Sequence, residues 1–177
     1  MDKVAVFIDA DNISAVHAGE IMKRAGKLGD VVICRAYGNC SGFTGEKSWK
    51  EGVRLFGIQA FPQISICDNK KNNADFALML DAWETVLTDC VFAICIVSSD
   101  SDFLPLVQRI RPRMSVYGFG GEQTPMAYQM AFMRFFGARF SIFSLSLPSI
   151  ESRLVWGCSG LVASQFLAIT AFLWMAA

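Results

Sequence analysis

The chain has 177 residues, of which 53% are hydrophobic and 18% are charged, so it can bury the core of one domain. Its formal net charge is zero, which excludes a global electrostatic attraction to nucleic acid or to an anionic membrane. The single histidine, His17, and six cysteines without a C-x-x-C pair argue against a structural zinc site and favour reduced thiols in the cytoplasm.

The first third of the chain is predicted to alternate between strands and helices. An apolar run at 4–8 predicts a buried strand, and a helix capped by Asn12 or Ser14 is expected to continue to about residue 25. A strand at 31–37, a helix at 46–56 and a strand at 58–66 follow. Pro62 within the last of these places that strand near a sheet edge or at a bulge.

An amphipathic helix at 74–87 is the clearest helical pattern. Its large apolar side chains have the spacing of a helix that packs one face on a core: Phe76, Leu80, Trp83 and Leu87. Asp75 lies in the first turn, where the helix dipole favours an anion. Then come a buried strand at 91–97, a helix at 103–110, a strand at 114–118, a helix from Thr124 to about 132 or 135, and a final strand at 139–147.

This alternation predicts an α/β fold of the Rossmann-like kind, with a central, mostly parallel sheet and helices on both faces. In such a sheet the first and fourth strands can lie side by side at the switch point. Ligands bind at the carboxyl ends of the strands there. Acidic residues that follow these two strands are therefore candidates for one shared site.

Acidic and amide side chains do follow both strands. Asp9, Asp11 and Asn12 come after the first, and Asp100 and Asp102 come after the fourth. Asp75 lies on the helix that leads into the fourth strand. Oxygen ligands without histidine or cysteine suit Mg²⁺ or Mn²⁺ better than zinc, and a carboxylate-bound ion of this kind supports hydrolysis of a phosphoester.

Three motifs resemble the NYN domain, and more narrowly its bacterial LabA-like branch within the PIN-like nuclease superfamily. They are Phe7–Asn12, Lys71–Ala82 and Val97–Leu106. The segments Tyr117–Gly120 and Thr124–Pro125 also fit, and the resemblance extends from about Val4 to Phe136. One departure is Ser99, where the family usually has glycine; a side chain there can crowd the turn before Asp100.

The resemblance implies a Rossmann-like PIN fold and a Mg²⁺- or Mn²⁺-dependent ribonuclease. The catalytic residues would be Asp9, Asp75, Asp100 and Asp102, with Asp9, Asp100 and Asp102 as metal ligands. The partner would be RNA, contacted by Asn12 near the acids and by basic side chains along the RNA backbone: Lys47, Lys50, Lys70, Lys71 and Arg109. Asp81 matches a family acid of less certain role.

Two other functions are compatible with the same residues. The Asp9-Ala-Asp11 sequence resembles the D-x-D motif of haloacid-dehalogenase-like phosphatases, in which Asp9 would be a covalent nucleophile, although Ile13 stands where threonine or valine is expected. The second alternative is a non-catalytic RNA-binding module in which the acidic site is vestigial.

The end of the chain has a different composition from the rest. We predict a nuclease domain at 1–147 and an apolar tail at 148–177, within which Leu154–Ala177 contains no charged residue. This stretch is long enough to cross a membrane as a helix, with the domain in the cytoplasm. A helix packed on the domain or on a partner, and a segment not selected to fold, are the alternatives. Assembly into a homo-oligomer is left open.

Overall fold

The computed structural model describes residues 2–44, 49–63, 73–137 and 142–143 of the chain. The seven strands of its sheet lie in the order β3-β2-β1-β4-β5-β6-β7. Their bounds are Lys3–Asp9 (β1), Asp30–Asn39 (β2), Gln59–Gln63 (β3), Ala93–Val97 (β4), Ser115–Gly120 (β5), Arg134–Gly137 (β6) and Ile142–Phe143 (β7). The sheet is central to the α/β fold that the sequence predicts.

Six of these strands are parallel, and only β7 runs antiparallel to its neighbour β6. The first and fourth strands are hydrogen-bonded neighbours, with Ile8 opposite Val97. From β1 the chain builds outward to β2 and β3 on one side, and from β4 to β5 and β6 on the other. The switch point is therefore between β1 and β4, as predicted, and their carboxyl ends share one edge.

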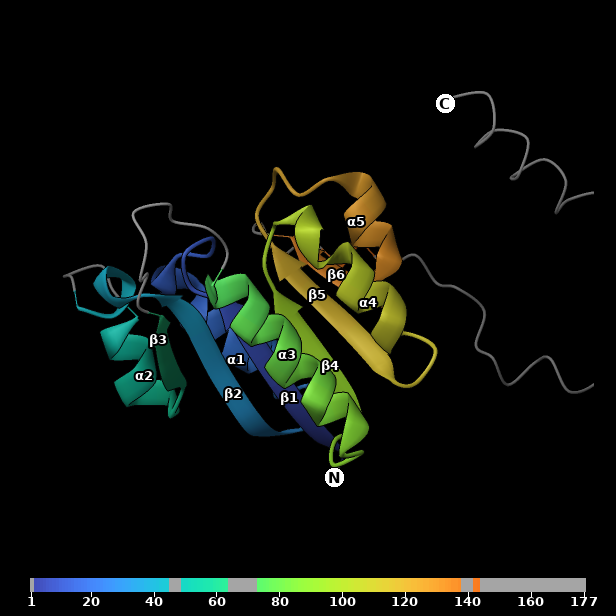
Figure 1. Ribbon diagram of the computed structural model, residues 1–177, viewed down its shortest axis with the longest axis horizontal. Helices are drawn as coiled ribbons and strands as arrows, with labels where there is room; N and C mark the ends of the chain where they lie inside the picture. Colours follow the sequence, from blue (N-terminus) through green and yellow to red (C-terminus); the bar gives the residue numbers. More distant parts are fainter. Residues whose placement is uncertain (1, 45–48, 64–72, 138–141, 144–177) are drawn as a thin grey trace, which may run out of the picture. The chain divides into compact units, whose positions relative to one another are not determined.

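Helices cover both faces of the sheet. Figure 1 shows α3 and α4 across the front face. The α-helices are Ala18–Ala25 (α1), Lys50–Phe56 (α2), Asn73–Leu87 (α3), Leu104–Ile110 (α4) and Met126–Ala131 (α5). Short 3-10 helices, Ala15–His17 (η1), Cys40–Phe43 (η2) and Ser101–Phe103 (η3), complete the described elements.

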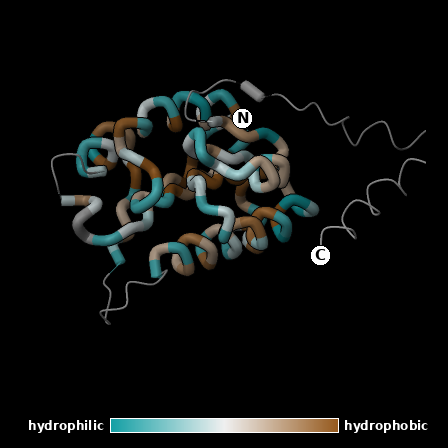
Figure 2. Tube along the Cα trace, turned by 90° about the horizontal axis from the view of Figure 1, so that it is seen from above, coloured by the Kyte–Doolittle hydropathy of each residue, from teal (hydrophilic) through white to brown (hydrophobic). Residues whose placement is uncertain are grey.

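Alternating side chains of β1 supply two separate cores. Val4, Val6 and Ile8 pack on the face that carries α1, while Ala5 and Phe7 pack on the face that carries α3, α4 and α5. All five are fully buried. Figure 2 shows hydrophobic stretches running through the middle of the domain. By this alternation the next residue, Asp9, is placed on the α3 side of the sheet.

The prediction for residues 132–135 was wrong, because α5 ends at Ala131 and a strand begins at Arg134. Phe132 already has an extended backbone (φ −80°, ψ 158°), and Phe135 and Phe136 then point to opposite faces. A Cβ on Gly118 would lie 2.4 Å from Phe135, so the glycine lets that ring pack directly on β5. Apolar periodicity in 126–136 is compatible with a helix or a strand, and this packing favours a strand at Arg134–Gly137.

The predicted core face of α3 was also wrong. Phe76, Leu80 and Leu87 are 59%, 70% and 60% exposed, so the apolar stripe faces outward. The helix instead packs on the sheet through another face, whose buried residues are Leu78, Ala82, Thr85 and Val86. Apolar spacing therefore predicts the helix but not which of its faces meets the sheet.

The edge position of β3 is confirmed, since β3 is the outer strand of the sheet and contains Pro62. In the described part of the chain, no helix is long and apolar enough to cross a membrane. The predicted apolar tail, residues 148–177, lies outside the described residues, and its assignment stays a prediction.

Candidate active site

A single hydroxyl joins the ends of β1 and β4. Ser98, which is fully buried, donates a hydrogen bond of 2.7 Å to Asp9 Oδ2. The same hydroxyl accepts a hydrogen bond of 3.0 Å from the backbone N–H of Asp100. Asp9 and Asp100 are therefore brought together at the switch point, as the sequence predicted.

Asn12 makes a second link between the two strand ends. Its backbone N–H donates to Asp9 Oδ1 at 3.2 Å, and its side-chain oxygen accepts from the backbone N–H of Ser99 at 3.0 Å. The prediction that Asn12 or Ser14 caps the first helix was wrong. The side chain of Asn12 bonds to Ser99 in the loop after β4, and Ser14 makes no capping hydrogen bond.

Burial raises the pKa of Asp9 from 3.8 to about 6. Hydrogen bonds from Ser98 and Asn12 lower the pKa of this carboxyl, while the charges of Asp75 and Asp11 raise it. Only 4% of Asp9 is exposed, so water screens its charge poorly. A buried anion surrounded by other anions is costly unless a cation or a proton offsets it.

Asp75 belongs to the same electrostatic cluster. It lies in the first turn of α3, as predicted, and burial is the main cause that raises the pKa of its carboxyl. Repulsion from Asp100, Asp11 and Asp102 raises it further. Asp102 is exposed on η3, where its backbone N–H donates to Asp100 Oδ1 at 2.9 Å. The charges of the other three predicted catalytic acids, Asp9, Asp100 and Asp102, thus all interact with that of Asp75.

Asp11 is hydrogen-bonded to the last residue of β2. Its carboxylate accepts from the backbone N–H of Asn39 at 3.0 Å and from the Asn39 side-chain amide at 2.9 Å. Asp11 affects the site through its negative charge, which raises the pKa of Asp9 and of Asp75. The sequence had placed Asp11 in the first acidic cluster without a role in the nuclease hypothesis.

Asp81 contrasts with the site acids because it is paired. Arg35 donates to Asp81 Oδ2 at 3.0 Å, and the hydroxyl of Tyr37 donates to the same oxygen. The guanidinium of Arg35 also lies over the ring of Phe61, 5.3 Å from its centroid. Asp81 therefore connects α3 to β2.

Tyr128 carries an unsatisfied polar atom near the site. Its hydroxyl is buried and has no hydrogen-bond partner among the described residues. Burial raises the pKa of Tyr128, and the charges of Asp100 and Asp9 raise it further, so the phenol lies within range of both acids. A buried donor without a partner beside carboxylates is where a water or a bound group would be expected.

Ser99 does not crowd the turn before Asp100. Its hydroxyl accepts a hydrogen bond of 2.6 Å from the backbone N–H of Gly121, just beyond β5. In this chain the side chain therefore ties the loop after β4 to the loop after β5.

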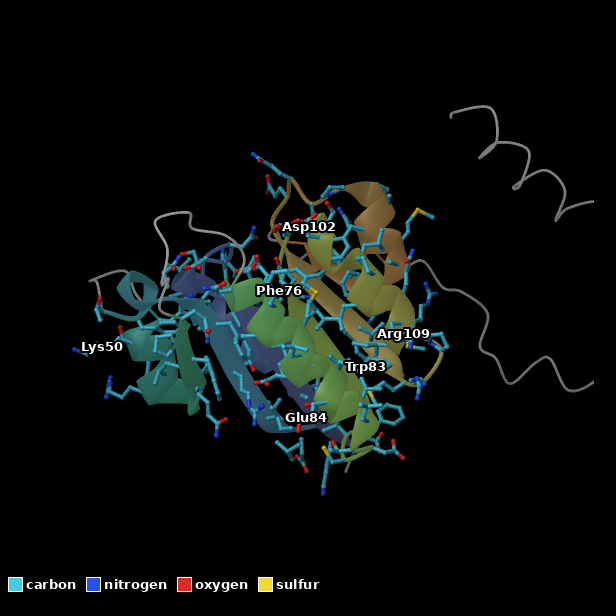
Figure 3. The ribbon with its side chains drawn as sticks, in the orientation of Figure 1. Lys50, Phe76, Trp83, Glu84, Asp102 and Arg109 are labelled. Atoms are coloured by element: carbon cyan, nitrogen blue, oxygen red, sulfur yellow. The ribbon has the colours of Figure 1, made fainter. Side chains whose placement is uncertain are left out.

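The basic residues predicted to contact RNA are dispersed. Figure 3 shows Lys50 on α2 at one side of the domain and Arg109 on α4 at the other, both away from Asp102. The guanidinium of Arg109 lies over the ring of Trp83, 5.4 Å from its centroid. Lys47, Lys70 and Lys71 lie outside the described residues. The role of all five stays a prediction.

The donor chemistry of the cluster fits a hard divalent cation. Carboxylate oxygens predominate, and their mutual repulsion is what a cation would relieve. Within the described ranges, however, no three histidine, cysteine or acidic side chains are arranged to hold a metal ion. Mg²⁺ commonly uses one or two carboxylates and takes its remaining ligands from water and substrate phosphate. A ligand set of Asp9, Asp100 and Asp102 stays a prediction.

Fold and motif together define an α/β domain with an acidic site at the switch point. The sequence matches the NYN domain family over residues 3–138, so the chain belongs to that family. Among curated proteins, none matches the chain.

A solved structure shares the fold. A crystal structure of a protein of unknown function from Vibrio parahaemolyticus is similar with a TM-score of 0.62 and 23% sequence identity. The similarity covers 77% of this chain and 93% of the other. At this level of identity the comparison supports the architecture alone.

Sequence reasoning missed two contributors to the site. Ser98 lies within the motif that follows β4, and a serine between a buried strand and an acid is a signal that could have been used. Tyr128 comes from α5, which the sequence connects to the acids by no spacing. Only the packing of α5 on the α3 side of the sheet brings its hydroxyl near Asp9 and Asp100.

Proposed function

We propose that this chain is a metal-dependent ribonuclease of the LabA-like branch. One observation carries the proposal: Asp9 and Asp100 are linked through Ser98 at the switch point, where they face the charge of Asp75. No lysine or arginine in the described ranges forms an ion pair with these acids. Membership of a nuclease-type family supports hydrolysis of RNA as the reaction.

The residues would divide the work as follows. Asp9 and Asp100 would hold Mg²⁺ or Mn²⁺, which lowers the pKa of a water and neutralises charge on the leaving oxygen. Asp75 and Asp102 would hold a second metal ion or orient the attacking water by accepting its hydrogen bond, and their charges interact within the same cluster. Asn12 and Ser98 fix the direction of the Asp9 carboxylate through their hydrogen bonds.

The phosphatase alternative is not favoured. In a D-x-D mechanism Asp11 would exchange a proton with substrate, but its carboxylate is occupied by the backbone and side chain of Asn39. The family match is to the NYN domain, over most of the described chain. Location in the cytoplasm, membrane association and homo-oligomer formation stay predictions.

The test is cleavage of a fluorescent single-stranded RNA by the full chain with Mn²⁺ or Mg²⁺. Asp100→Asn should reduce cleavage by about a thousandfold or more while RNA binding, measured by anisotropy, persists. Asp30→Asn is the matched control, since Asp30 is exposed at the opposite end of the sheet, at the start of β2. Cleavage that does not need the metal, or that survives in Asp100→Asn, would refute the proposal. RNA binding without any cleavage would favour the non-catalytic module.

A further inference from the structure

A cavity of about 200 Å³ opens beside the acidic cluster. Its floor is apolar and is formed by Ile13, Ile21, Val97 and Phe119. Val97 and Phe119 belong to the core on the α1 face of the sheet, whereas Asp9 and Asp75 lie on the α3 side. The cavity is therefore a separate space on the other side of the same strand ends.

The rim of the cavity is polar but carries no fixed charge among its described residues. Asn12, Ser14, His17 and Ser99 line it. The amide oxygen of Asn12 is engaged by the N–H of Ser99, which leaves the NH₂ group of Asn12 as its donor. The hydroxyl of Ser14 makes no capping hydrogen bond. Donors and acceptors thus surround an apolar floor.

Backbone forms the remaining wall, at Gly120 and Gly121. A Cβ on Gly120 would lie 2.7 Å from the Thr124 hydroxyl and 2.8 Å from the ring of Phe135. The N–H of Gly121 is held by the Ser99 hydroxyl. The Cβ position of Gly120 thus faces Phe135 on the α3 side, so Gly120 presents only backbone atoms to the cavity.

We propose that this cavity binds one nucleobase of the RNA whose phosphodiester lies at the acidic cluster. The proposal rests on the proposed ribonuclease function and adds a subsite for the base. An apolar floor with hydrogen-bonding groups at the edge is complementary to an unstacked base, which has an apolar face and a polar rim. A water molecule has a share of about 30 Å³ in the liquid, so the cavity has room for a group of several heavy atoms.

Other ligand classes fit less well. A phosphate would need lysine or arginine, and a metal ion or an amine would need carboxylates; the described lining residues include none of these. The floor residues Val97 and Ile21 favour burial of an uncharged group.

Asn12 connects the cavity with the acidic cluster. Its backbone N–H contacts Asp9, and its side chain lines the cavity. Ser98 and Ser99 make the equivalent connection after β4, since Ser98 contacts Asp9 and Ser99 lines the cavity. An RNA strand that crosses this edge can place a phosphate on one side and a base on the other.

The direct test is a titration of the full chain, without metal, by adenosine, guanosine, cytidine and uridine. His17 is the only histidine in the 177 residues, so its imidazole C–H resonances report the cavity in an unlabelled NMR spectrum. We expect a saturable shift with at least one nucleoside and none with ribose. Absence of a shift with all four nucleosides would overturn the proposal.

Blocking the rim gives an independent test. Ser14→Phe places a ring at the mouth of the cavity and removes no capping hydrogen bond. It should weaken nucleoside binding, and binding of a non-cleaved RNA, by about tenfold or more. Val16→Phe is the matched control, because Val16 is 78% exposed on the short helix that follows Ser14 and does not line the cavity. Equal effects of both variants would overturn the proposal.

The two proposals fail in different ways. If the chain cleaves RNA but neither nucleosides nor Ser14→Phe have an effect, the subsite is wrong and the ribonuclease stands. If nucleosides bind at His17 and no metal supports cleavage, the subsite stands and the ribonuclease is wrong. The titration of the unaltered chain needs no variant to fold and is decisive by itself.

Discussion

Two groups of acids on the α3 side of the sheet differ in how their charge is balanced. Asp81 is paired with Arg35 and receives a further hydrogen bond from Tyr37. Asp9 and Asp100, at the strand ends, are joined by a neutral hydroxyl and have other acids around them. The first arrangement stabilises the fold without any added ion, while the second leaves negative charge uncompensated.

The contrast teaches which acids to regard as functional. An acid paired with arginine inside one domain needs nothing further, whereas buried acids that repel one another are stable only with a proton or a cation. The predictions below test whether this distinction holds, beginning with the largest effect.

Asp9 should make stability depend on pH. Its pKa is raised from 3.8 to about 6 by burial, so the stability that the protonated carboxyl contributes is fully present below pH 3.8 and is lost as pH rises through 6. The loss is about 3 kcal/mol. Chemical unfolding of the wild type in EDTA should show this loss, while Asp9→Asn should have a cost that does not vary with pH. Identical pH profiles for the two proteins would contradict the assignment of Asp9 as an uncompensated buried acid.

Binding of a divalent cation should restore the folding stability that is lost as the pH rises. At about a hundred times its dissociation constant, Mn²⁺ should raise the stability of the folded wild type near neutral pH by about 2.7 kcal/mol, measured by thermal unfolding. Asp100→Asn should lose this gain, and Asp81→Asn should retain it because Asp81 already has Arg35 as its partner. A gain that is the same in all three proteins would mean that the ion binds elsewhere.

Removing the paired acid should affect the fold more than the chemistry. Asp81→Asn breaks the ion pair with Arg35 and weakens the hydrogen bond from Tyr37, at a cost of about 1–2 kcal/mol in unfolding free energy. Because Asp81 is paired with Arg35 and has no proposed contact with the metal ion or the substrate, cleavage per folded molecule should change only severalfold. A loss of cleavage comparable to that of Asp100→Asn would place Asp81 in the site after all.

Tyr128→Phe should have the smallest effect on stability. The buried hydroxyl has no partner in the described part of the chain, so removing it should leave the unfolding free energy within about 1 kcal/mol or raise it slightly. Retention of Mn²⁺ binding with slower cleavage would indicate that the hydroxyl acts on water or substrate. A destabilisation of several kcal/mol would show instead that the hydroxyl is satisfied in solution.

Much of this architecture follows from local pattern. The run Ala93–Val97 is entirely buried, as its uninterrupted apolar sequence indicates, and the acids after β1 and β4 meet because parallel neighbours end at one edge. Asp75 was placed correctly in the first turn of α3. These predictions depend only on periodicity and on the rule for switch points.

The failures depend on packing that periodicity does not contain. The apolar spacing of Phe76, Leu80 and Leu87 is correct for a helix but does not say which face meets the sheet, and a different face is buried there. Phe135 and Phe136 fit a helix or a strand until their pairing with β5 and β7 is known. Tyr128 reaches the site only through the way α5 packs.

The two hydrogen bonds to Asp9 have a consequence for how an ion would arrive. Oδ1 accepts from Asn12 and Oδ2 from Ser98, and the Ser98 proton must point to Asp9 because its oxygen already accepts from Asp100. The carboxylate is thus preorganised, with its remaining lone pairs aimed in fixed directions. The entropic cost of fixing this carboxylate is therefore met when the chain folds, and binding of a cation would not add it again.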